Sequence, residues 1–176
     1  AIARLLFHHA ATGTVIERDG VAVGSQLIGQ EFRDPGRFWS RPSATGPIPY
    51  VAFDRVGPSG SSGSNLGPTS PALRDAVAAR VHALLAAEQA LGITDGAPIP
   101  IDLVTASASG LDPHLSVAGA LRQVRRVAAA RGRPEAEIAE LVEEHVDEPW
   151  LGVLGERVVH VLQLNLALDA RARPGR

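Results

Sequence analysis

The residue types best suited to chemistry concentrate in residues 105–114, which read TASASGLDPH. This segment lies between an apolar run at 99–104 and a helix expected to begin after Ser116. Free backbone N–H groups and the helix dipole favour an anion at such a place, so the pattern predicts a phosphate or carboxylate site. The alternative interpretation is a tight turn in which Asp112 and Ser116 bond to the backbone while His114 is exposed.

The same segment also contains the residue types of a serine hydrolase. Ser107, Asp112 and His114 could act as nucleophile, orienting acid and base, but adjacency in sequence is not the arrangement of a triad. The Gly-x-Ser-x-Gly elbow of such enzymes is absent. A hydrolase would therefore need Ser107 or Ser109 to be activated by a histidine from elsewhere, and His160 is the candidate.

A second run of small residues, 59–68, reads SGSSGSNLGP and superficially resembles a phosphate cradle. No lysine accompanies it, so a flexible or packed surface loop is an equal alternative. Metal ligands are sparse: His8 with His9, and Asp112 with His114, are the neighbouring pairs, and neither has a recognised ligand spacing. We expect no metal site.

Composition excludes several function classes. A length of 176 residues suits one globular domain. The formal charge of −2 argues against nucleic-acid binding through a basic surface. All 17 cationic residues are arginine, so the lysine of a P-loop and any Schiff base are excluded. The absence of cysteine excludes disulfides, thiolate nucleophiles and Cys-ligated zinc.

Turn signals and apolar periodicity predict an α+β fold, a mixed β-sheet with about three packed helices in a single domain. The elements expected in chain order are a hairpin at 13–28, a long loop at 35–71, a helix at 71–91, a strand at 99–104, helices at 117–131 and from 134, and β structure at 152–155 and 158–164.

Charge patterning marks two of these helices. The helix at 117–131 carries several arginines and the next one several glutamates, a pattern typical of solvated faces or, alternatively, of a partner interface. Arg80 instead falls within the apolar stripe of the helix at 71–91. It should either extend its head group to solvent or pair with a buried acceptor.

Several segments together resemble the C subunit of the Kdp potassium-transporting P-type ATPases. They occur in the family's order: GSQLIGQEF at 24–32, RPSAT at 41–45, SGSNLGP at 62–68, LVTASASGLDPH at 103–114, QVRRVAAARG at 123–132, and LG-LGE with VLQLNLALD at 151–169. Val51, Val117 and His160 depart from residues common in the family, and the loop after Tyr50 is longer.

The resemblance implies a non-catalytic subunit of a potassium uptake complex, with no enzymatic activity alone. Potassium crosses the family's A subunit and its B subunit hydrolyses ATP. The C subunit is described as a catalytic chaperone that raises the ATP affinity of the B subunit, or as an outer-side subunit above the potassium entrance. No cofactor is expected to bind tightly; weak ATP binding shared with the B subunit would use Ser107, Ser109, His114 and Gln123.

The resemblance also implies a membrane anchor and a partner surface. Residues 1–12 are expected to be the end of a truncated N-terminal transmembrane helix that exposes Leu5, Leu6 and Phe7, followed by a soluble domain at 13–170 and a frayed tail at 171–176. The protein would be a single-pass plasma-membrane protein with its domain on the outer side. The interface candidates in the long loop are Trp39, Tyr50, Phe53, Ser64 and Asn65. The alternative interpretation is that the aromatic residues of the loop only anchor it onto the sheet, which is the expectation for Phe38.

Overall fold

The structure is a computed structural model that describes residues 2, 6–51 and 60–171. Its elements in chain order are α2 (His8–Ala11), β1 (Val15–Arg18), β2 (Val21–Ser25), α3 (Pro71–Gln89), the 3-10 helix η1 (Ile101–Leu103), β3 (His114–Ser116), α4 (Val117–Arg131), α5 (Glu135–Glu144), β4 (Val146–Asp147), β5 (Val158–His160) and α6 (Val161–Arg171). The predicted α+β class is confirmed. None of the described helices is long and apolar enough to span a membrane.

Two small antiparallel sheets form the β part of the fold. Strands β1 and β2 make the predicted hairpin, and Asp19 and Gly20 at its tip have φ of 54° and 76°, the left-handed conformation that a two-residue turn requires. The other sheet has the order β3-β5-β4, so β5 is central although it comes last in the chain. Its register pairs Leu115 with Val159.

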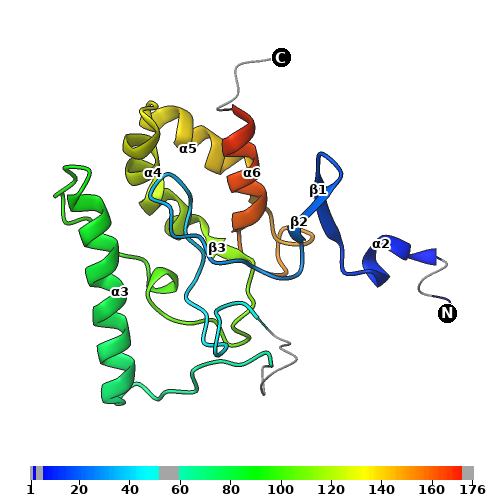
Figure 1. Ribbon diagram of the computed structural model, residues 1–176, viewed down its shortest axis with the longest axis horizontal. Helices are drawn as coiled ribbons and strands as arrows, with labels where there is room; N and C mark the ends of the chain where they lie inside the picture. The colour runs from blue at the N-terminus through cyan, green and yellow to red at the C-terminus, as the bar shows by residue number, and fades with distance from the viewer. Residues whose placement is uncertain (1, 3–5, 52–59, 172–176) are drawn as a thin grey trace.

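The hydrophobic core lies where α4, α5 and α6 pack together beside the β3-β5-β4 sheet, and α3 lies to one side of this unit and adds Leu84 to the core (Figure 1). The fully buried residues of the core come from the long loop, from β3 and β5 and from the three helices: Phe38, Leu115, Val127, Ile138, Leu141, Val142, Val159, Val161 and Leu164. Helix α3 is mostly exposed and buries only Leu84 and Glu88.

Helix α4 begins and ends where the sequence predicts. The Ser116 hydroxyl accepts a hydrogen bond from Gly119 N–H at 2.9 Å, which satisfies one of the free donors of the first turn. At the other end Gly132 has φ of 61°, and Arg133 N–H bonds to the Ala128 carbonyl at 3.0 Å. Helix α5 follows directly after Pro134, also as predicted.

The strand predicted at 99–104 is wrong, because this segment contains the turn of η1 instead. The turn directs the Val104 carbonyl toward α3, where it accepts a hydrogen bond from Arg80 Nη1 at 2.8 Å. Of the two alternatives expected for Arg80, the structure shows pairing with a buried acceptor. From sequence alone, a mostly apolar run of six residues fits a strand and a buried turn equally well, because the segments that it packs against are not known.

The β structure predicted at 158–164 is only half correct, since β5 ends at His160 and α6 starts at Val161. The buried residues Val161, Leu164, Asn165 and Leu168 follow helical spacing, which marks the face of α6 toward the core. At 152–155 the predicted β structure is wrong as well; the structure has a tight turn there, closed by an isolated bridge between Trp150 and Leu154.

The arginines of α4 do not form a solvated face. Arg126 is 1% exposed and Arg122 is also largely covered, whereas Arg125 is half exposed and pairs with Asp95 and Glu135. The partners that bury these cations come from segments distant in sequence, so helix periodicity did not reveal them. Helix α4 is consequently the central element on which the long loop and α3 are assembled.

Candidate functional site

The long loop is held on the bundle by amide side chains that bond to its backbone. Phe38 N–H donates to Asn165 Oδ1 and Asn165 Nδ2 donates to the Phe38 carbonyl, both at 2.9 Å. Gln123 binds Trp39 in the same way, at 2.8 and 3.1 Å. Phe38 itself is fully buried, which confirms it as the internal anchor of the loop.

Trp39 is half-buried and has a fixed orientation. The guanidinium carbon of Arg126 lies 4.2 Å from the Trp39 ring centroid, within the range of a cation-π interaction. On its other side Trp39 Nε1 donates to the Asp34 carbonyl at 2.9 Å. The indole is therefore held in place while part of it stays accessible.

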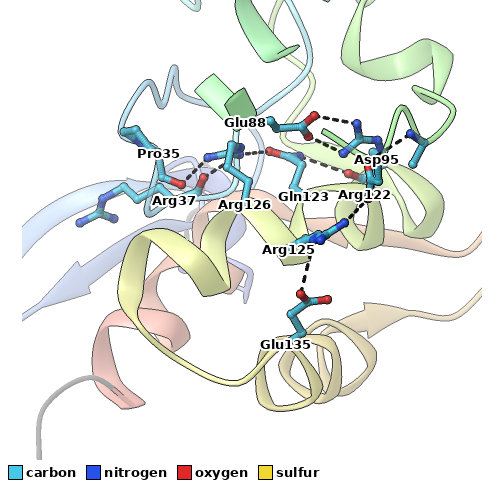
Figure 2. A network of polar contacts seen from close by, with 11 residues as sticks. Pro35, Arg37, Glu88, Asp95, Arg122, Gln123, Arg125, Arg126 and Glu135 are labelled. Carbon is cyan, nitrogen blue, oxygen red and sulfur yellow. Dashed lines mark hydrogen bonds and ion pairs between the residues drawn. The ribbon is translucent and has the colours of Figure 1, made fainter. Parts of the chain in front are cut away.

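Arg126 organises a buried polar network beneath this loop (Figure 2). It donates to Gln123 Oε1 at 2.6 Å, to the Arg37 carbonyl at 3.1 Å and to the Pro35 carbonyl. Burial lowers the pKa of Arg126 to about 10, while Glu88 and Asp34 favour its charged form. Arg126 thus stays cationic at neutral pH and binds the loop by charge-assisted hydrogen bonds.

The same network ties α3 to α4. Glu88, which is 3% exposed, receives two hydrogen bonds from Arg122, one of them 2.8 Å between Arg122 Nη2 and Glu88 Oε2. In the segment that follows α3, Asp95 Oδ2 pairs with Arg125 Nη1 at 2.5 Å (Figure 2). The Arg122–Glu88 pair thus adds to the apolar contacts that Val77, Val81 and Leu84 of α3 make with the core.

A cavity of about 410 Å³ lies between the long loop and α3. Aromatic and cationic groups share its wall, and the lining residues relevant here are Phe32, Arg33, Trp39, Arg41, Tyr50, Arg80 and Leu84. Tyr50 donates its hydroxyl to the Arg41 carbonyl at 2.5 Å. Burial raises the pKa of Tyr50 to about 12, so this hydroxyl remains a donor.

Residues 105–114 form a tight turn whose hydroxyls bond to the local backbone, as in the alternative interpretation, although His114 is half-buried rather than exposed. Ser107 is 3% exposed and its hydroxyl accepts from Gly110 N–H at 2.9 Å, and the Ser109 hydroxyl accepts from Leu111 N–H at 3.1 Å. His114 belongs to β3 and precedes the helix by three residues. The hydroxyls expected to face a ligand thus serve the local backbone.

The start of α4 is already occupied by an anion of the protein itself. Asp102 Oδ2 accepts a hydrogen bond from Ser116 N–H at 2.8 Å. A Cβ on Gly119 would approach this carboxylate to 2.8 Å, so the absence of a side chain there allows the close approach. At the helix start where the sequence predicts an anion of a ligand, the structure has the carboxylate of Asp102.

The histidines do not activate a serine. His160 Nε2 lies 3.1 Å from the Gln26 carbonyl, and its Nδ1 accepts from Gln163 N–H at 3.3 Å. His114 meets the His160 ring edge-on at 5.3 Å between centroids. Across the described part of the chain, no serine hydroxyl bonds to a histidine ring, so the geometry offers no support for the hydrolase alternative.

Asp112 links this histidine pair to the long loop. It accepts from Arg41 Nη1 at 2.9 Å, and its other oxygen accepts from His114 N–H at 3.0 Å. Burial opposes ionisation of Asp112, but the hydrogen bonds from His114 and Arg41 hold its pKa below the usual range. The carboxylate is thus committed to positioning the loop.

The remaining candidates are spread over different parts of the molecule. Gln123 is 1% exposed with its amide fully used by Trp39, Gly119 and Arg126, so it does not face a ligand together with His114. Ser64 and Asn65 are exposed, whereas Phe53 lies outside the described residues. No cluster of three or more metal-ligating side chains occurs within 6–51 or 60–171.

The two motifs rich in small residues contact one another. Ser62 N–H bonds to the Ser109 carbonyl at 2.9 Å, and a Cβ on Gly63 would lie 2.8 Å from the Ala108 carbonyl. Residues 60–63 are therefore packed against the 107–110 turn by close backbone approach. At the N-terminal end, Leu6 and Phe7 are 66% and 67% exposed, as expected; Leu5 lies outside the described residues.

Sequence patterns miss several residues on which this site depends. The charge pattern of α4 predicts Arg122 and Arg126 only as members of a solvated face or an interface, and no pattern singles out Glu88 or Asp102. The available signal is weak: Arg122 and Arg126 are one helical turn apart on α4, and Asp102 stands inside an apolar run. Their partners lie in other elements, which periodicity does not identify.

Fold and site together define a small α+β domain with a surface of aromatic and arginine side chains that hydrogen bonds hold in place. Residues 1–170 match the family described as K+-transporting ATPase, c chain. The chain is 58% identical over 168 residues to the potassium-transporting ATPase KdpC subunit of Polaromonas naphthalenivorans, covering 96% of this chain and 81% of that protein. The chain therefore belongs to the KdpC family of potassium-transporting ATPase subunits.

Two further relatives carry the same description. The KdpC subunit of Sorangium cellulosum is 56% identical over 169 residues, which cover 96% of this chain and 84% of that protein. The one from Herpetosiphon aurantiacus is 54% identical over 168 residues, with 96% and 82% covered. The resemblance seen in the motifs is thus confirmed over almost the whole chain.

Proposed function

We propose that this chain is a non-catalytic subunit of a potassium-transporting ATPase complex and that it works by contact with the A and B subunits. The cavity between the long loop and α3 is the centre of that contact surface. Its aromatic and cationic lining carries the proposal, since rigid aromatic and arginine side chains are the groups that protein interfaces favour.

The way the loop is held supports this assignment. Phe38, Trp39 and Arg41 are each fixed by hydrogen bonds to distant elements, so the loop loses little conformational entropy when a partner binds. Catalysis, in contrast, would need a nucleophile paired with a base, and the candidate serines bond to local backbone instead.

We further propose that any effect of this subunit on the ATP affinity of the B subunit is transmitted through assembly rather than through a nucleotide site at Ser107, Ser109, His114 and Gln123. Support comes from the burial of Ser107 and Gln123 and from Asp102 at the start of α4. ATP titrated into the purified chain to millimolar concentration should give no saturable heat. Saturable binding that Ser109→Ala abolishes would contradict this part of the proposal.

Charge reversal of Arg33 tests the contact surface. Arg33 lines the cavity, and its side chain is 79% exposed and bonds to Glu31 at 2.8 Å. In the full-length protein co-expressed with the A and B subunits, Arg33→Glu should lower the amount of both that co-purifies by about tenfold, together with potassium-stimulated ATPase activity. Trp39→Ala is a poorer probe because it also removes the stacking partner of Arg126.

Arg74→Glu is the matched control. Arg74 has the same 79% exposure and an acidic neighbour, Asp75 at 3.5 Å, but it lies outside the cavity lining. Assembly should be unchanged in this variant. If both variants lose assembly equally, the cause is a general charge effect. Normal assembly of the Arg33→Glu variant would disprove the contact surface.

The membrane anchor and the outer-side location belong to the same proposal. A cysteine introduced at Ser64, which is exposed, can be labelled in intact cells with a membrane-impermeant maleimide, since the chain has no other cysteine. Labelling of intact cells is expected for an outer-side domain. Labelling only after the cells are opened would place the domain in the cytosol.

A further inference from the structure

A tight apolar turn projects from the molecule between β4 and β5. Residues 149–155 read PWLGVLG and contain no charge. The large side chains of this turn are strongly exposed, with fractions of 69% for Trp150, 73% for Leu151, 77% for Val153 and 57% for Leu154. Four large apolar side chains on one short turn form a contiguous patch of the kind that marks a binding site.

The turn is closed by several backbone hydrogen bonds. Trp150 N–H donates to the Leu154 carbonyl at 2.9 Å and Leu154 N–H returns a bond to the Trp150 carbonyl at 3.0 Å. A further bond from Gly152 N–H to the Pro149 carbonyl measures 2.8 Å. Leu151 has φ of 54°, a left-handed conformation that costs a non-glycine residue energy and that glycine would adopt freely.

The surroundings of the apolar turn are acidic. Asp147 and Glu148 precede it and Glu156 follows it. The adjacent cation, Arg157, is already engaged by Glu148 at 2.9 Å and by Glu143 at 3.7 Å. An anionic lipid surface attracts apolar segments that are flanked by lysine and arginine, so this charge pattern opposes a membrane as the occupant.

We propose that the apolar turn inserts into an apolar pocket with a basic rim on another polypeptide of the transport complex. This inference rests on the proposed function, that the chain acts by contact with partner subunits, and adds a second docking element at a place distinct from the cavity beside α3. The preformed turn presents its side chains without an ordering cost, and the acidic flanks match a cationic rim.

Val153→Glu tests the docking of the apolar turn in the full-length protein co-expressed with the A and B subunits. Because the Val153 side chain is 77% exposed, the variant should keep the wild-type unfolding temperature. Co-purification of the partner subunits should fall about tenfold, and wild-type retention should weaken as salt rises because the rim contacts are ionic. Ile101→Glu, at a residue that is 74% exposed on η1, is the matched control and should assemble normally.

A photo-crosslinking amino acid at position 153 identifies the occupant, and flotation of the wild type with phosphatidylglycerol vesicles tests the membrane alternative. A crosslink to a protein subunit that Val153→Glu abolishes supports the inference. Unchanged assembly of Val153→Glu, or vesicle binding that this variant loses, overturns it while leaving the proposed function intact. If the wild-type chain co-purifies with neither subunit, the proposed function fails and the docking turn fails with it.

Discussion

The side-chain amide of Gln123 pairs with both main-chain groups of Trp39, accepting from its N–H at 2.8 Å and donating to its carbonyl at 3.1 Å. Asn165 does the same for the preceding residue, Phe38. Two neighbouring loop residues thus receive from helix side chains the partners that a sheet would supply. This is how a loop without regular structure becomes a defined surface.

Gln123→Leu should destabilise the fold although it adds apolar volume. The substitution leaves the Trp39 N–H and carbonyl without their partner in a covered place, and each such group costs about 1–3 kcal/mol. Urea unfolding at neutral pH should therefore show a loss of about 2–4 kcal/mol. Gln89→Leu, at an exposed position of α3, is the control and should change stability by less than about 0.5 kcal/mol. A similarly small effect for Gln123→Leu would show that the loop does not depend on this amide.

Gly119→Ala should also destabilise, against the helix propensity that normally favours alanine by about 1 kcal/mol. The new Cβ would stand 2.8 Å from the Asp102 carboxylate and displace it from the start of α4. The expected net loss is about 1–2 kcal/mol, the usual value of a lost cap. In an Asp102→Ala background the same substitution should become neutral or stabilising, and an equal loss in both backgrounds would contradict the assignment of Asp102.

Glu88 and Arg122 should behave as a strongly coupled buried pair. Removing one partner leaves an uncompensated charge between α3 and α4, so Glu88→Leu and Arg122→Met should each cost about 3–5 kcal/mol. The double variant should lose less than either single change, because two apolar side chains can fill the site. Thermal unfolding of all four proteins measures the coupling, and additive losses would show that the pair does not interact.

His160 should make stability depend on pH below neutrality. Burial lowers the pKa of His160, and the nearby His114 acts in the same direction, while the Gln26 carbonyl and Asp147 oppose it. As pH falls below about 6.5, the unfolded chain therefore takes up a proton that the folded chain refuses, and stability declines until the folded-state pKa is reached.

His160→Asn should flatten this decline in the range below about pH 6.5. Unfolding free energies measured by urea at intervals across that range give the slope. His82→Asn, at an exposed histidine on α3, should retain the wild-type slope. A slope that His160→Asn leaves unchanged would assign the pH dependence to another group.

Local signals in the sequence predicted several elements correctly. The ends of α4 depend on Ser116 and Gly132, and the hairpin depends on Asp19 and Gly20; each signal acts within a few residues of its own position. The motif segments likewise identified the family, since their order and combination can be read from the sequence without knowing the distance between any two residues in space. These features belong to short stretches of chain and need no tertiary partner.

Tertiary structure alone decided the partners of the polar residues. Ser107 and Gln123 look like ligand groups in the sequence, whereas in the fold both are buried and bond to the backbone. Asp102, absent from any sequence pattern, occupies the position predicted for a phosphate. The physical reason is that a hydrogen bond or an ion pair depends on which groups meet in space, and decisive partners here are far apart in the chain: Ser116 and Asp102 by 14 residues, Phe38 and Asn165 by 127.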